Sequence, residues 1–117
     1  MQFSKSLKLN HLFRRLYSKG KSAAGKYLVL YCRRNGTQEN RIGLTVSAKL
    51  GHAVVRNKLR RRLRECYRQH ETEFRRGYHM VIVARSRAVK ASYAELEKSL
   101  LKLAAMQSLL QEADEHA

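Results

Sequence analysis

Proline is absent from this sequence of 117 residues. The sequence also has no internal repeat and no segment of low complexity, so nothing in it marks a linker between domains. A chain of this length can bury one hydrophobic core but is too short for a second. We therefore predict a single domain over residues 1–117, with an ordered core at about 7–110 and an acidic tail at 111–117.

Cysteine is scarce. Cys32 and Cys66 are the only two, they lie far apart, and neither belongs to a CxxC pair. Each lies in an otherwise apolar run. We therefore interpret both as small residues of the core, in preference to a disulfide or a metal-ligand pair.

Long hydrophobic runs are missing as well. No apolar run approaches the roughly 18 residues that a membrane-spanning helix needs. The segment 1–9 lacks the hydrophobic stretch of a secretion signal. We expect a cytoplasmic protein with no membrane partner.

Acidic residues are few compared with basic ones. Nine Asp and Glu stand against 25 Lys and Arg, which gives a formal net charge of +16. Solubility alone needs a net charge of only about 2–8. Because the charge is so one-sided, we predict a polyanionic partner.

The shortage of carboxylates also argues against cleavage chemistry by the protein's own side chains. Two-metal hydrolysis of a phosphodiester needs clustered carboxylates, and the only aspartate is Asp114, in the tail. Hydrolysis without a metal would need paired histidines as acid and base. The five histidines are scattered over the predicted elements: His11, His52, His70, His79 and His116. We expect no catalytic residue and no metal site in the protein.

Strands are predicted in three places. Residues 27–32 and 41–47 are rich in β-branched and aromatic residues, and residues 80–84 are apolar on both faces, as in a central strand. The turn signal Asn35-Gly36 lies between the first two. It favours a hairpin that pairs these two strands.

Helices are predicted around the strands. Apolar residues recur at helical spacing over residues 9–17, with a possible cap at Asn10, and the helix is expected to end before Gly20. A second helix is expected from Gly51 to about Phe74. Ser92 and Glu95 form a capping-box pattern, which predicts the start of a third, long helix. Apolar residues at helical spacing continue to Leu110.

The order of these elements is α-β-β-α-β-α, with room for a further short strand. A strand, a crossover helix and another strand form a βαβ unit. The fold class predicted is α+β, with a mixed sheet of the four-stranded type packed by helices.

The helix over residues 54–68 carries seven basic residues and a single acidic one, Glu65. At about 100° per residue, one side gathers the residues expected to face the sheet, which are Val55, Leu59, Leu63, Cys66, His70 and Phe74. A neighbouring arc collects a stripe of polar residues, which are Asn57, Arg60, Arg61, Arg64 and Arg68. A solvated helix face usually mixes both signs of charge, so this stripe indicates phosphates nearby. Glu65 can pair with Arg61 or Arg68.

Arginine outnumbers lysine in this helix, which favours a nucleic acid because guanidinium groups bind phosphate bidentately and stack on bases. Phe13, Tyr17 and Tyr31 could serve as a stacking platform for unpaired bases. For each aromatic residue alone, packing in the core remains an alternative. Together with the basic helix, they favour RNA over DNA, so the single domain is predicted to bind RNA.

These residues carry a family resemblance. The segment 53–65, with the sequence AVVRNKLRRRLRE, resembles the characteristic motif of the bacterial ribonuclease P protein subunit. The preceding segment 43–51 (GLTVSAKLG) and the later segment 81–85 (VIVAR) are similar to further parts of that family. The resemblance runs from about Leu7 to Leu103.

The resemblance implies a function and a set of partners. In that family a catalytic RNA performs the hydrolysis, with Mg²⁺ implied at the RNA active site and no cofactor on the protein alone. The protein, a monomer within a 1:1 ribonucleoprotein, binds the single-stranded 5′ leader of precursor tRNA and contacts the RNA subunit. The fold implied is ribosomal-protein-like, with a left-handed βαβ crossover.

The resemblance also assigns residues to these two roles. The leader-binding cleft would contain Phe13, Tyr17, Ser22 and Tyr31. The motif helix would bind RNA through Arg56, Asn57, Lys58, Arg60, Arg61 and Arg64, to which the basic stripe adds Arg68.

Two other classes of protein share some of these features. A non-catalytic ribosomal protein or RNA chaperone would share the charge and the sheet-plus-helix build, but it would need no aromatic platform for single strands. A basic helix lying on a membrane surface is the third alternative. It is disfavoured because the apolar side of the helix is required by the sheet.

Overall fold

The structure is a computed structural model that describes the backbone of residues 4–6 and 10–111 and the side chains of residues 14–111. Helices α1, α2 and α3 span Asn10–Lys19, Ala53–His70 and Tyr93–Met106. The strands are β1 (Ser4–Ser6), β2 (Lys21–Ala24), β3 (Leu28–Arg34), β4 (Asn40–Thr45) and β5 (Tyr78–Ala84). Three 3-10 turns, η1 (Ala48–Leu50), η2 (Glu71–Glu73) and η3 (Ser86–Lys90), join them.

The five strands form one mixed sheet in the order β1-β4-β5-β3-β2. β4 runs parallel to β5 and to β1, whereas β3 is antiparallel to β5 and to β2. The α+β class, the order of the main elements and the β4-α2-β5 crossover are confirmed. Two short strands, β1 and β2, join the sheet where the sequence left room for one. The handedness of the crossover stays a prediction.

The predicted hairpin is wrong. β3 and β4 do not pair with each other, because β5 lies between them and bonds to both. The apolar character of β5 on both faces explains this position, since Met80, Val81 and Ile82 are all buried. A strand that is apolar on both sides loses most by lying at an edge.

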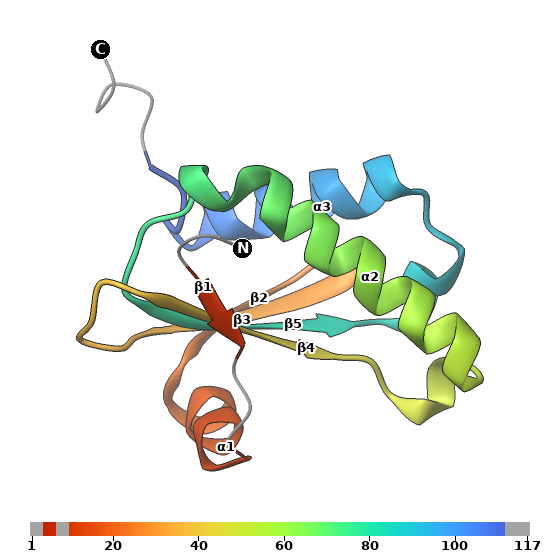
Figure 1. Ribbon diagram of the computed structural model, residues 1–117, viewed down its shortest axis with the longest axis horizontal. Coiled ribbons are helices and arrows are strands. Elements are labelled where there is room, and N and C mark those ends of the chain that lie inside the picture. Colours follow the sequence, from red (N-terminus) through yellow and green to blue (C-terminus); the bar gives the residue numbers. More distant parts are fainter. Residues whose placement is uncertain (1–3, 7–9, 112–117) are drawn as a thin grey trace.

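The two faces of the sheet are covered unequally (Figure 1). α2 and α3 pack on one face, where they enclose the main core of alternating strand residues such as Leu30, Met80 and Ile82. α1 lies on the opposite face, where Leu16 packs against Val81. Cys32 and Cys66 are free and buried in the main core, which confirms their interpretation.

Helix ends follow local chemistry. The Gly20 amide donates to the Leu16 carbonyl (2.9 Å) where α1 ends, and a Cβ at Gly20 would lie 2.5 Å from that oxygen. Ser92 caps α3, and the predicted capping box with Glu95 is confirmed. α3 ends at Met106, however, and the prediction that it includes Leu110 is wrong, because Leu110 instead forms a β-bridge with Phe74.

The second helix is also shorter than predicted. α2 ends at His70, and a 3-10 turn leads to Phe74, which is buried against Tyr67 with ring centroids 4.9 Å apart. Val55 was expected on the buried side but is 37% exposed. Its first-turn position places it beside Gly51, before the helix overlies the sheet.

His70 links the end of α2 to α3. The sequence places this residue on the apolar side of the helix, but the ring lies between two carboxylates, with Nδ1 bonded to Glu73 and Nε2 to Glu97 at 3.0 Å. Partial burial opposes protonation of the ring, yet the hydrogen bonds and charges of Glu97 and Glu73 outweigh it and raise the pKa of His70.

This raised pKa predicts a pH-dependent stability. A pKa higher in the folded than in the unfolded state means that protonated His70 stabilises the fold. The contribution is complete below the unfolded value of about 6.5 and is lost as the pH rises through the folded value. Urea unfolding of the wild type and His70→Gln should therefore differ more at pH 6 than at pH 8. A constant difference would contradict the two-carboxylate account.

Candidate nucleic-acid interface

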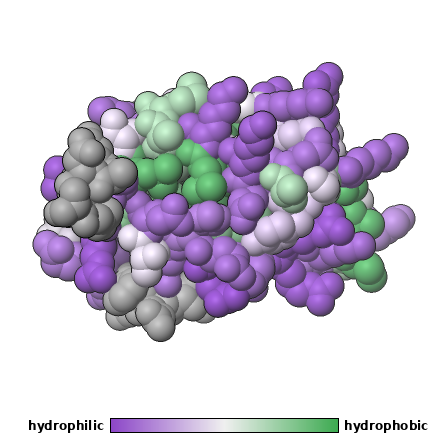
Figure 2. Space-filling model, turned by 90° about the horizontal axis from the view of Figure 1, so that it is seen from above, coloured by the Kyte–Doolittle hydropathy of each residue, from purple (hydrophilic) through white to green (hydrophobic). Residues whose placement is uncertain are grey.

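α2 presents one side to the core and the other to solvent. Leu59, Leu63, Cys66 and Tyr67 are its buried residues. Arg61 and Arg64 lie across the helix from them and are exposed. Figure 2 views this side of the molecule from above and shows a mainly hydrophilic surface with a few small hydrophobic patches. The predicted stripe is therefore turned toward solvent.

Two of the predicted RNA-binding arginines of α2 already have partners within the protein. The Arg56 Nε donates to the Gly51 carbonyl at 3.1 Å, which fixes its side chain near the start of the helix. Arg60 Nη1 donates to Asn57 Oδ1 at 3.0 Å. These two contacts hold guanidinium groups in place without neutralising them, because neither acceptor carries a charge.

Glu65 pairs with Arg68 and not with Arg61, the other partner that the sequence allowed. Arg68 donates to it through Nε (2.8 Å) and Nη2 (2.6 Å), and Gln69 adds a bond of 2.9 Å. The hydrogen bonds from Arg68 and Gln69 lower the pKa of Glu65 to about 2. Arg68 is therefore neutralised in the free protein and is the weakest member of the stripe as a phosphate ligand.

Three cations remain available. Lys58, Arg61 and Arg64 are exposed, and none makes a hydrogen bond or ion pair with any side chain that the structure describes. Their charges lie on a helix with only one carboxylate, which is occupied by Arg68. These residues can turn toward an external phosphate without breaking an internal contact.

The predicted cleft residues lie on the other face of the sheet. The rings of Tyr17, on α1, and Tyr31, on β3, meet edge to face with centroids 4.8 Å apart. Ser22, on β2, is exposed and lies directly opposite Tyr31 in the strand pairing. The Tyr17 hydroxyl shares a hydrogen bond of 3.1 Å with the Thr45 hydroxyl on β4. The side chain of Phe13 lies outside the described residues, although its backbone is in α1.

The structure therefore brings three of the predicted cleft residues together: Tyr17, Ser22 and Tyr31. We call these three residues the aromatic surface. Tyr17 is 42% exposed and Tyr31 is half-buried, so both rings can offer an edge or a face to a base. The sheet separates the aromatic surface from α2 (Figure 1). The two groups of predicted residues form two surfaces on opposite faces.

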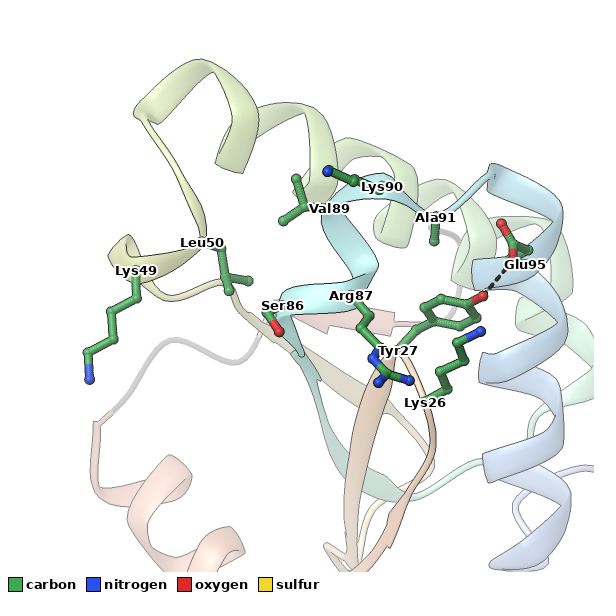
Figure 3. Close-up of a pocket in the computed structure, with 10 residues that line it drawn as sticks. All are labelled: Lys26, Tyr27, Lys49, Leu50, Ser86, Arg87, Val89, Lys90, Ala91 and Glu95. Carbon is green, nitrogen blue, oxygen red and sulfur yellow. Dashed lines mark hydrogen bonds between the residues drawn. The ribbon is translucent and has the colours of Figure 1, made fainter.

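A third basic feature of the structure was not predicted from the sequence. A pocket of about 460 Å³ lies between the start of β3, η1, η3 and α3 (Figure 3). Its lining includes four cations, which are Lys26, Lys49, Arg87 and Lys90. Glu95 is the one carboxylate of this lining, and the Tyr27 hydroxyl donates to it at 2.5 Å. These residues come from four separate segments without a shared motif, so no pattern in the sequence could have grouped them.

The described residues contain no group of three His, Cys, Asp or Glu side chains that could hold a metal ion. No helix among them is both long enough and apolar enough to cross a membrane.

Comparison with known proteins gives consistent results. A family model described as Ribonuclease P matches residues 1–107. The chain is 41% identical over 107 residues to the ribonuclease P protein component of Alkaliphilus oremlandii, covering 92% of this chain and 94% of that protein. The fold is similar to that of the Staphylococcus aureus RNase P protein, with a TM-score of 0.83, 31% identity and coverage of 91% and 97%. The RNase P protein from Thermotoga maritima gives a TM-score of 0.77, with 29% identity over 84% of this chain and 93% of that one.

Proposed function

The chain belongs to the ribonuclease P protein family, and we propose from this that its two surfaces hold two different RNA segments within the ribonuclease P ribonucleoprotein. The aromatic surface binds the single-stranded 5′ leader of precursor tRNA. The exposed cations of α2 face the catalytic RNA subunit. The protein thus positions the precursor against the RNA that cuts it.

The observation that carries this proposal is the separation of the two surfaces by the sheet. Stacking rings suit unpaired bases of any sequence, whereas guanidinium groups on a rigid helix suit the phosphates of a folded RNA. A protein that bound only one RNA segment would need only one of these surfaces. Membership of the family suggests two RNA ligands for the two surfaces, the RNA subunit and precursor tRNA.

The chemistry belongs to the RNA subunit in this proposal. The acidic residues of α2 and α3 are already bonded to protein groups, as Glu65 is to Arg68 and Glu95 to Tyr27. Mg²⁺ acts at the RNA active site, and the protein's cations lower the local negative charge there. One protein molecule accompanies one RNA subunit, and the complex works in the cytoplasm.

Replacing Tyr17 with alanine tests the leader-binding role. Stacking on an aromatic side chain contributes about 1–3 kcal/mol per base, so Tyr17→Ala should weaken binding of a leader-bearing precursor roughly 5- to 150-fold. Mature tRNA, which has no leader, should bind the holoenzyme almost as before. The measurement is equilibrium binding of both RNAs to the reconstituted holoenzyme.

Tyr17→Phe is the matched control, because it keeps the ring and removes the hydroxyl that bonds to Thr45. It should bind the precursor nearly as well as the wild type. Equal losses for precursor and mature tRNA in Tyr17→Ala would favour a general RNA-binding protein over a leader-binding one.

A further inference from the structure

Three basic side chains form a row across the sheet beside the aromatic surface. Arg33 on β3 and Arg41 on β4 both lie directly opposite His79 on β5. Residues directly opposite each other in neighbouring strands project on the same face of a sheet. Arg33 follows Tyr31 by two positions, so the row shares the face of Tyr31 at a distance of about 7 Å along the strand. We call Arg33, His79 and Arg41 the basic row.

The elements around this row carry no carboxylate, and the nearest one in sequence is the exposed Glu39, two positions before Arg41. The sequences of β1, β2, β3, β4, β5 and α1 contain no Asp or Glu, and the charged residues of α1 are Arg14, Arg15 and Lys19. Arg33 and Arg41 flank His79 from two different strands, so each of them faces the ring and not the other arginine. Their combined charge attracts an anion and opposes a positive charge on His79.

One atom of the basic row is a hydrogen-bond donor without an acceptor. Arg33 Nη1 is buried and has no hydrogen-bond partner within the part of the chain that the structure describes. A buried donor without an acceptor is unfavourable and uncommon in folded proteins. Because this nitrogen is closed to solvent in the free protein, the Arg33 side chain must turn outward to donate to a phosphate oxygen, and it breaks no hydrogen bond of this nitrogen in doing so.

The ring of His79 is sensitive to such an anion. Burial and the charges of Arg41 and Arg33 lower the pKa of His79, so the ring is harder to protonate when the row is free. A phosphate placed between the two arginines would counter their charges and favour protonation of the ring. The row can then supply a third charge to the ligand.

We propose that Arg33, His79 and Arg41 bind a backbone phosphate of single-stranded RNA whose neighbouring base lies on the aromatic surface. The ligand class is an RNA phosphodiester, held by guanidinium groups that can donate two hydrogen bonds each. The inference rests on the proposed leader-binding function and extends it by one contact. It makes leader binding dependent on pH.

Salt titrations of the holoenzyme with leader-bearing precursor test the row. Each phosphate contact with a single strand contributes about 0.7 to the log–log slope of affinity against salt. Because the row binds one phosphate, Arg41→Gln and Arg33→Gln should each reduce the slope by at most that amount and weaken binding severalfold. Arg34→Gln is the matched control, since Arg34 is the next residue of β3, exposed, and lies over the Tyr78 ring on the other face.

A loss of folding would be recognised directly. Removing one of two like charges should leave the thermal midpoint of Arg41→Gln unchanged or raise it.

The wild type should bind precursor more tightly at pH 6 than at pH 8, because binding takes up a proton on His79. His79→Gln should flatten that dependence while binding at pH 8 changes little.

The outcomes separate the inference from the function on which it rests. If Tyr17→Ala weakens leader binding but the Arg33 and Arg41 variants keep the wild-type slope, the basic row is not a phosphate site and the leader-binding function stands. If none of the three affects leader binding, the leader-binding function fails as well. A pH dependence that persists in His79→Gln would also overturn the inference.

Discussion

The double variant Arg61→Ala/Arg64→Ala is expected to remain folded and to lose processing of precursor tRNA at low magnesium concentration. Both side chains are exposed and have no partner among the described residues, so their removal breaks no internal contact. In the complex they would stand against phosphates of the RNA subunit. Cations of the protein and Mg²⁺ from solution screen the same phosphate charges. Loss of the two arginines should therefore raise the Mg²⁺ concentration that processing requires.

The size of the effect follows from counterion release. Each contact with duplex phosphate contributes about 0.9 to the salt slope, so the double variant should lower the slope for assembly with the RNA subunit by nearly 2. Added Mg²⁺ should restore much of the activity. The measurements are the salt dependence of assembly and the processing rate over a magnesium series.

Two controls make this result specific. Lys98→Ala/Lys102→Ala removes the same charge from exposed, one-turn-apart positions on α3, and it should leave the magnesium requirement near that of the wild type. Arg61→Lys/Arg64→Lys keeps the charge and should recover most of the slope. If the alanine variant processes precursor normally at low magnesium, the outer side of α2 does not contact RNA.

The basic stripe could be predicted because it depends only on helical periodicity. One element of fixed pitch sets which side chains share a side, so the sequence alone placed Arg61 and Arg64 away from Leu59 and Leu63. The sequence could not choose between Arg61 and Arg68 as the partner of Glu65. That choice depends on side-chain geometry, and both Nε and Nη2 of Arg68 reach the carboxylate.

Strand order could not be predicted, because a turn signal is local and strand pairing is not. Asn35 does form a turn, in which its Oδ1 accepts from the Thr37 amide and its Nδ2 donates to the Glu39 carbonyl, both at 2.9 Å. However, the Asn35 amide donates to the Gly77 carbonyl, just before β5. The loop therefore passes over the start of β5, and nothing within residues 34–40 signals that a third strand enters there.

The basic row was missed for the same reason. Arg33, Arg41 and His79 are far apart in the chain, and each looks like an ordinary solvated residue of its own strand. Only the insertion of β5 between β3 and β4 makes them neighbours. In a β3–β4 hairpin, His79 would not have lain between the two arginines.

A buried asparagine helps to hold β5 in that position, and its loss should be the most destabilising change considered. Asn40 is 2% exposed. Its Oδ1 accepts from the Tyr78 amide at 2.9 Å, and its Nδ2 donates to the Arg75 carbonyl at 2.9 Å. A weaker contact of 3.3 Å joins Nδ2 to the Tyr67 hydroxyl on α2. One side chain thus connects the start of β4, the entry to β5 and the crossover helix.

Asn40→Ala would leave a backbone donor and a backbone acceptor without partners in a largely buried place. Each such group costs about 1–3 kcal/mol, so we expect a loss of about 2–4 kcal/mol from a total that is on the order of 5–15 kcal/mol. Urea unfolding should show a lower midpoint with an unchanged slope. Tyr67→Phe removes the hydroxyl that makes the weak third contact but keeps the bonds of Asn40 to Tyr78 and Arg75, so it should cost much less.

The comparison of the two variants distinguishes a positional role from simple burial. If Asn40→Ala and Tyr67→Phe lose the same small amount, the bonds to Tyr78 and Arg75 do not hold β5, and its central place rests on its apolar side chains alone. If Asn40→Ala shows the larger loss, the entry of β5 is fixed by polar bonds as well. Because β5 supplies His79 and carries Val81 beneath α1, the same bonds would then set the alignment of the face on which we place the leader.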